Sequence, residues 1–217
     1  MRYKSAVLFG LLVASELSAC AVPSFYTAEN LDARVVDAET KLPIPGVIVV
    51  ASWTLSGGTM EGKPMGSLVA GEAITDNEGR FHIAGWGRTE RPSSGILDVL
   101  DPEFVLYKPG YLLAYKTNYN PSIPLYDTVD RSVRTSRWNG KDITLEKDNG
   151  NPNRFQDNFI GAFVPLYVIY DSPDCKWKRI PRAVHAFEQE RLRQLKFERP
   201  LRVVPPLELL LSRPNCQ

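Results

Sequence analysis

Few side chains in this 217-residue chain combine a residue type and a spacing that could support chemistry. The two histidines, His82 and His185, are 103 residues apart. No H-E-x-x-H, G-x-S-x-G or P-loop motif occurs, so the sequence lacks the signatures of zinc peptidases, serine hydrolases and nucleotide-binding enzymes. None of the three cysteines, Cys20, Cys175 and Cys216, has a second cysteine or a histidine at metal-ligand or C-x-x-C spacing. The sequence therefore predicts no metal site, no cofactor and no redox centre.

The chemistry that the sequence does favour is acylation of Cys20. Arg2 and Lys4 precede an apolar run at residues 5–15, which is shorter than the ~20 residues that span a bilayer but suits an export signal. Residues 17–20 (LSAC) resemble the lipobox of bacterial lipoproteins, in which small residues admit the signal peptidase and the cysteine thiol carries lipid. This resemblance implies a signal peptide at 1–19 and a palmitate-bearing, lipidated tether at 20–30. The alternative is an ordinary secretory signal that is cleaved after small residues.

Charge and position suggest how such a protein would meet the membrane. Removal of residues 1–19 leaves 24 basic and 24 acidic residues, so the net charge is about zero, with no polybasic patch and no electrostatic footprint for nucleic acid. The acyl chains on Cys20 are then the expected contact with the lipid bilayer. An aspartate after the cysteine retains enterobacterial-type lipoproteins in the inner membrane; Ala21 stands there, which implies the outer membrane, facing the periplasm or the cell surface.

With Cys20 bearing lipid, Cys175 and Cys216 remain as an even pair in an oxidising compartment. We expect them to form a disulfide. Closing a loop of about 42 residues would stabilise the fold by up to roughly 4 kcal/mol in the chain-entropy model.

Residues 31–145 read as β structure. Short runs rich in Val, Ile, Thr and aromatic residues recur between turn signals, which favours a β-sandwich with Greek-key or meander connections. The segment SGGTMEGKPMGS (56–67) is expected to be a glycine-rich connection. The runs are DARVVDA, GVIVVASW, GEAITD, RFHIAGW, EFVLYKPGYLLAY and KDITLEK.

Three elements of this region, ARVVDAETKLPIPGVIVVASW, EAITDNEGRFHIAGW and FVLYKPGY, resemble the carboxypeptidase regulatory-like domain. The resemblance covers residues 31–147 and implies a seven-stranded transthyretin-like (prealbumin-like) β-sandwich. The expected turn residues are Gly46, Asp76, Gly79 and Gly110. Gly79 is expected in the left-handed conformation, with Phe81 and Ile83 pointing inward.

Residues 148–217 are expected to form a small disulfide-linked, α-helical C-terminal extension. The apolar run 155–170 fits either a buried helix kinked at Pro165 or a pair of strands. From Pro181 an amphipathic helix is predicted, followed by a short helix at LELLLS (207–212). The apolar face of the amphipathic helix is expected to comprise Ile180, Val184, Phe187 and Leu195, and its solvated side Glu188, Glu190, Arg191 and Arg193.

Enzymes that share the transthyretin-like fold are not supported by the sequence. Hydroxyisourate hydrolases end in Y-R-G-S, whereas this chain ends in P-N-C-Q. Intradiol dioxygenases hold iron with two tyrosines and an H-x-H pair, which is absent here. Two binding alternatives remain open: calcium at Asp76, Asn77 and Glu78, for which a metal-free turn is preferred, and a sugar-binding aromatic platform. The platform would comprise Trp53, Trp86, Trp138, Tyr115, Tyr119 and Tyr126.

The sequence thus predicts a mainly β, non-catalytic envelope lipoprotein that acts as a binding or structural module. Its expected partner is another envelope protein. The alternatives are a component of a secretion or envelope assembly, and a carbohydrate-binding or enzyme-accessory module acting on glycans.

Overall fold

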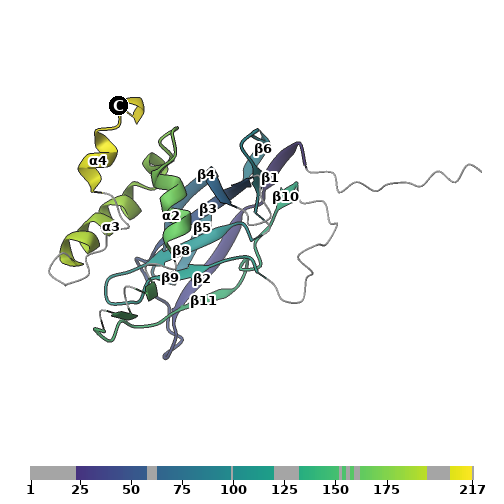
Figure 1. The fold of residues 1–217 in the computed structure, drawn as a ribbon. Helices are drawn as coiled ribbons and strands as arrows, with labels where there is room; N and C mark the ends of the chain where they lie inside the picture. Colours follow the sequence, from purple (N-terminus) through teal and green to yellow (C-terminus); the bar gives the residue numbers. More distant parts are fainter. Residues whose placement is uncertain are drawn as a thin grey trace, which may run out of the picture.

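The computed structural model describes residues 23–57, 63–98, 100–119, 132–151, 153–154, 157–158, 162–194 and 206–216. Cys20, Tyr126 and Leu195 lie outside these ranges. The described part is mainly β, with helices gathered on one side of the strands (Figure 1). No helix in the described ranges is long and apolar enough to cross a membrane.

The largest sheet contains five strands in which β3 is central. Its order is β4-β3-β8-β9, and β7 also pairs with β3. All of its pairings are antiparallel. The strands are β3 (Ile48–Gly57), β4 (Lys63–Ile74), β7 (Ile96–Leu97), β8 (Glu103–Tyr107) and β9 (Ala114–Lys116).

Two three-stranded sheets complete the β part. One has the order β11-β2-β5, formed by β11 (Asp142–Leu145), β2 (Leu31–Asp37) and β5 (Arg80–Ile83). The other has the order β10-β1-β6, formed by β10 (Val133–Arg134), β1 (Phe25–Ala28) and β6 (Trp86–Glu90). In each sheet one outer strand runs parallel to the middle strand and the other antiparallel to it.

Strand β3 is buried on both faces because it lies between two cores. Val49, Ala51 and Trp53 point into a core shared with β2, β5, β8 and β11. Val50 points the opposite way, into a second core that the helices cover. This explains why GVIVVASW is a continuous apolar run rather than an alternating one.

The second core joins the C-terminal extension to the large sheet. It includes Val105 and Tyr107 of β8, Leu166 and Ile169 of helix α2 (Phe163–Tyr170), and Phe187 of helix α3 (Pro181–Gln194). The rings of Tyr107 and Phe187 are 5.4 Å apart. Short elements complete the layer: η1 (Lys176–Arg179), α4 (Leu207–Leu211) and η2 (Pro214–Cys216).

The structure decides between the two alternatives for residues 155–170, because Phe163–Tyr170 is helix α2. The predicted helices at Pro181 and at LELLLS are present as α3 and α4. The disulfide between Cys175 and Cys216 is also present, with their Cα atoms 5.7 Å apart.

Three predictions about the boundaries and surfaces of elements are wrong. Phe25–Ala28, assigned to the tether, forms β1, where Tyr26 is buried. Much of the expected connection 56–67 is strand, because β3 continues to Gly57 and β4 begins at Lys63. Glu190 was predicted on the solvated side of α3 but is buried. There its carboxylate accepts a hydrogen bond from Tyr107 Oη (3.0 Å) and pairs with Arg193 (2.6 Å).

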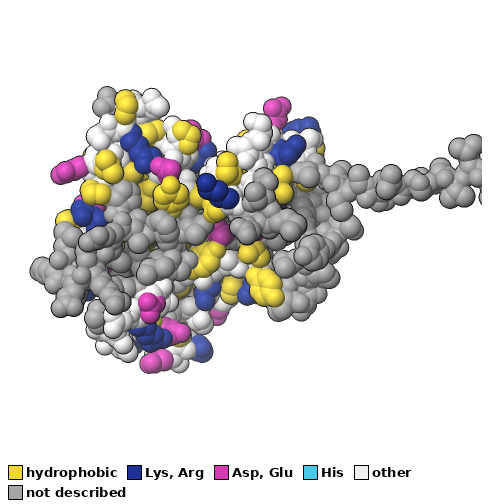
Figure 2. Space-filling view, in the orientation of Figure 1, with side chains coloured by type: hydrophobic (Ala, Val, Ile, Leu, Met, Phe, Trp, Pro, Cys, Tyr) yellow, Lys and Arg dark blue, Asp and Glu magenta, His cyan; other side chains and the backbone are white. Residues whose placement is uncertain are grey.

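Exposed apolar side chains lie on both the β part and the helices. Figure 2 shows hydrophobic side chains at the upper left, where α4 lies, and also nearer the centre. The exposed large apolar residues of the described helices, each 43–56% exposed, are Tyr167, Leu192, Leu209 and Leu211.

Candidate functional site

The predicted turn residues lie in the β part. Gly46, Gly79 and Gly110 have φ values of +70°, +72° and +86°, in the left-handed region. Asp76 Oδ1 accepts hydrogen bonds from the backbone N–H groups of Glu78 (3.0 Å) and Arg80 (2.8 Å). The carboxylate that the calcium alternative would use is therefore already closing the turn, and the described residues contain no cluster of three or more potential metal ligands.

The two histidines lie on different elements. His82 is exposed on β5, and its Nδ1 lies 2.8 Å from Oδ1 of Asp32. His185 is exposed on α3. They do not form the closely spaced pair that an intradiol dioxygenase requires.

The five described aromatic residues considered for a sugar platform do not share one exposed face; Tyr126, the sixth, lies outside the described residues. Trp53 is buried and meets Trp86 edge to face, with ring centroids 5.6 Å apart. Trp138 is half-buried and donates its indole N–H to the carbonyl of Thr117 (2.9 Å). Tyr115 faces the helical layer, whereas Tyr119 is 48% exposed.

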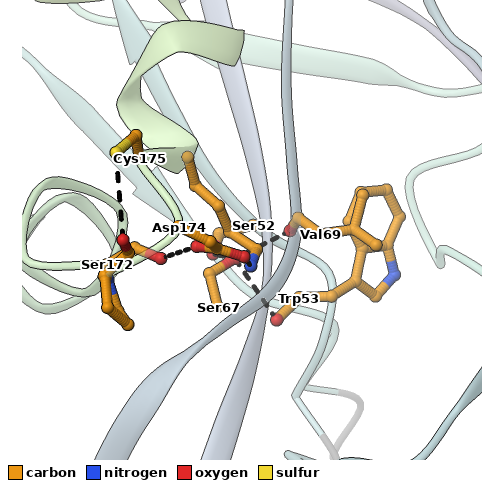
Figure 3. A network of polar contacts seen from close by, with 9 residues as sticks. Ser52, Trp53, Ser67, Val69, Ser172, Asp174 and Cys175 are labelled. Carbon is orange, nitrogen blue, oxygen red and sulfur yellow. Dashed lines mark hydrogen bonds and ion pairs between the residues drawn. The ribbon is translucent and has the colours of Figure 1, made fainter. Parts of the chain in front are cut away.

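A polar network crosses the large sheet beyond the apolar core. Ser52 donates to Ser67 across the β3–β4 pair (3.1 Å), and Ser67 donates to the carbonyl of Val69 (2.8 Å). Figure 3 shows these serines with the Ser172–Cys175 turn, and the two elements that flank this turn, α2 and η1, contact β4.

Two buried carboxyl groups lie further along the same sheet. Thr54 donates its backbone N–H to Asp101 Oδ1 (2.9 Å) and its hydroxyl to Glu103 Oε2 (2.7 Å). Tyr115 donates its hydroxyl to Glu103 Oε1. Burial raises the pKa of both Asp101 and Glu103 above the usual carboxyl range. Because both are buried, we assign this pair to the interior of the β part rather than to an accessible site.

The accessible candidate site is a groove on the outer face of the β11-β2-β5 sheet, which we call the charged groove. Its volume is about 370 Å³. It is lined by Asp32, Ala33, Arg34, Arg80, Phe81, Gly140, Lys141 and Asp142. Apart from buried Ala33 and Phe81, these lining residues are half-buried or exposed.

Strand register sets the charges of the groove in a row. Arg34 on β2 is directly opposite Arg80 on β5 and, on its other side, Asp142 on β11. Arg34 donates Nε and one terminal nitrogen to the two carboxylate oxygens of Asp142, at 2.8 and 2.7 Å. This two-point hydrogen bond holds the pKa of Asp142 below its usual value.

The other two cations of the groove, Arg80 and Lys141, are exposed. Within the described part of the chain, neither has an ion-pair partner. The second carboxylate of the groove, Asp32, is paired with His82. The groove therefore has the chemistry of an anion-binding surface.

Sequence reasoning missed this groove. The signal was the polar half of the alternation in two predicted strands, Asp32 and Arg34 in one, Arg80 and His82 in the other. No prediction was made from the sequence about Arg34 and Arg80 together, because the register that places them side by side depends on strand pairing.

Comparisons with known proteins give no family. No family model and no curated protein matches the chain. Among solved structures, it is similar to 3-chlorocatechol 1,2-dioxygenase from Rhodococcus opacus 1CP, with 17% identity and a TM-score of 0.34 over 57% of this chain and 61% of that enzyme. Hydroxyquinol 1,2-dioxygenase from Pseudomonas putida DLL-E4 gives 18% and 0.33 over 59% of each chain. Catechol 1,2-dioxygenase from Pseudomonas arvilla C-1 gives 15% and 0.35 over 61% and 56%. The match thus spans less than two thirds of these enzymes.

These neighbours contradict one prediction from the sequence. The chain was expected to be non-catalytic, yet the structures that it resembles include several dioxygenases. The exclusion of catalysis is therefore wrong. At these identities and TM-scores the likeness assigns no reaction to the chain.

Proposed function

We propose that this protein is a membrane-anchored lipoprotein of the bacterial cell envelope and acts there as a binding module. Acylated Cys20 holds it to the outer membrane, and the β part, a transthyretin-like sandwich, presents the binding surface to the periplasm. The observation that carries the proposal is the Cys175–Cys216 disulfide, because such bonds persist in exported proteins and are rare in the cytosol. The LSAC sequence at 17–20 adds the lipid acceptor.

The anchoring is tested by replacing the acceptor thiol. In cells fed labelled palmitate, the wild-type protein is expected to take up label and to fractionate with membranes, whereas Cys20→Ser takes up none and loses its membrane partition. Cys216→Ser is the control, since it makes the same substitution at a disulfide-bonded cysteine and leaves the acceptor in place. Label in the Cys20→Ser protein, or its retention in the detergent phase, would contradict lipid anchoring. Unlabelled wild-type protein cleaved after Ala19 would instead indicate an ordinary secretory signal.

The binding role is tested by crosslinking in intact cells followed by mass spectrometry. A stoichiometric envelope protein is expected to be recovered with wild-type protein. Recovery of the protein on isolated peptidoglycan or polysaccharide, with no protein partner, would support the glycan alternative.

A further inference from the structure

We propose that the charged groove binds a small dicarboxylate, with one carboxylate held by Arg80 beside Arg34 and the other by Lys141. This goes beyond the proposed function, because neither the anchoring nor the envelope partner requires the groove. It concerns a chemical class of ligand rather than a location.

The first argument is the imbalance of charge between the paired strands. Side chains directly opposite each other in an antiparallel pair lie about 5 Å apart at Cβ, and like charges in such positions destabilise the sheet. Arg34 and Arg80 occupy such positions, and the single carboxylate in their row, Asp142, binds Arg34 through both of its oxygens. Arg80 has no ion-pair partner within the described residues, so a bound carboxylate would reduce the repulsion between Arg80 and Arg34.

The second argument is that the backbone groups at the rim are already used. Asn139 Oδ1 accepts the N–H of Asp32 (2.9 Å), and the N–H of Gly140 is donated to the Asp32 carbonyl (2.7 Å). Recognition must therefore come from side chains. Of the three cations that line the groove, Arg80 and Lys141 have no ion-pair partner within the described residues, and a guanidinium suits the planar carboxylate in particular.

Size and spacing point to a small ligand with two charges. The volume of about 370 Å³ lies in the range of small-molecule sites, roughly 300–1,000 Å³. Arg80 belongs to β5, and Lys141 immediately precedes β11, with β2 between them. Two strand spacings, about 10 Å, thus separate the two backbones, and both residues line the groove.

The test uses glutarate as the probe and glutaramide as its uncharged counterpart, with the full chain in low salt because exposed charges are screened. Titration calorimetry is expected to detect binding of glutarate and none of glutaramide. Arg80→Gln should weaken binding about tenfold, since it removes a charge-assisted two-point hydrogen bond. Asp142→Asn should strengthen binding several-fold, because it releases Arg34 toward the ligand.

Two matched controls separate a site from a general charge effect. Arg179→Gln removes an exposed arginine from η1, and Glu90→Gln removes an exposed carboxylate from β6. Both should leave affinity for glutarate unchanged. The proposal is overturned if wild-type protein does not bind glutarate, if glutaramide binds equally well, or if Arg179→Gln weakens binding as much as Arg80→Gln. Loss of membrane anchoring in Cys20→Ser would not affect any of these results.

Discussion

Gly79 is the residue at which the hairpin between β4 and β5 depends most on the absence of a side chain. Its φ is +72°, and a Cβ built on it would lie 2.5 Å from the carbonyl oxygen of Val35. Backbone strain and a clash with backbone atoms therefore act together against any replacement.

We predict that Gly79→Val lowers the free energy of unfolding by about 3 kcal/mol, since a β-branched residue is strongly disfavoured at positive φ. Urea unfolding of the purified protein measures the change. Gly71→Val is the matched control: Gly71 lies in β4, has no positive φ, and a Cβ there would meet nothing within 4 Å. Equal stability of the two variants would show that the turn at Gly79 is not strained.

Asp37 gives the protein a pH-dependent contribution to stability. Its carboxylate accepts the backbone N–H groups of Thr40 and Glu39, as well as the hydroxyl of Tyr111. These hydrogen bonds, that of Thr40 first, hold the pKa of Asp37 well below its usual range. Because the folded pKa is lower than the unfolded one, about 3.9, the stabilisation is present above that pH and is lost as pH falls.

We predict that Asp37→Asn makes the free energy of unfolding less dependent on pH below about 4, because the side chain no longer takes up a proton on unfolding. Denaturant unfolding at a series of pH values from 2 to 6 measures this slope. An unchanged slope in Asp37→Asn would be the contrary result.

Individual buried charges were beyond prediction from the sequence. The periodicity of α3 correctly identified Val184 and Phe187 as buried, since an apolar residue is buried wherever a helix packs. Glu190 was misplaced because it packs against the sheet, where it accepts a hydrogen bond from the hydroxyl of Tyr107, which is 83 residues away in sequence. No local pattern carries such a pairing.

At the scale of elements, α3 is fixed to the sheet by its first turn. Glu72 of β4 accepts the backbone N–H groups of Arg182 (3.0 Å) and Ala183 (2.9 Å) through its two carboxylate oxygens. These are two of the N–H groups that a helix leaves without an internal partner, and a negative charge at a helix N-terminus is favourable. The cap thus comes from another element.

We predict that Glu72→Ala destabilises the protein by about 1–2 kcal/mol, in the range of lost helix caps. Hydrogen exchange of the Arg182 and Ala183 amides should accelerate before that of the strands. Glu90→Ala, at an exposed position on β6, is the control and should change neither measurement. Slow exchange of both amides in Glu72→Ala would mean that the carboxylate does not hold the start of α3.

Most strands were predictable as elements because their sequences alternate or form short apolar runs, as in Leu31–Asp37 and Arg80–Ile83. β1 was missed since its four residues lie within the predicted tether, residues 20–30, and carry no turn signal of their own. The hairpin of β3 and β4 was underestimated because Gly57 and Gly66 read as loop residues, although strands of a long hairpin accommodate them.

For the molecule as a whole, the two cores make the helical extension a third layer rather than an appendage. In the structure, Phe187 meets Tyr107 of the sheet directly, and α2 completes the same core. The sequence could not show this, because both faces of β3 and β8 are apolar and either could have been the outer one.

We predict that removing the disulfide loosens this layer before the β core. The Cys175→Ser/Cys216→Ser double variant, which leaves no free thiol in the extension, should lose about 2–4 kcal/mol of stability. Hydrogen exchange should rise first in α3 and α4, and with them in the sheet residues that they cover, such as Val105. Reducing agent should have the same effect on wild-type protein and none on the double variant. Equal acceleration of hydrogen exchange in β2 and β5 would contradict the prediction that the helical layer loosens before the β core.

The position of β1 has a consequence for reach. Strand β1 begins at Phe25, five residues after the cysteine proposed to carry lipid. Five fully extended residues span at most about 18 Å. Under the proposed anchoring, β1 therefore stays within about 18 Å of the lipidated cysteine. Whatever the protein binds must come close to the membrane surface.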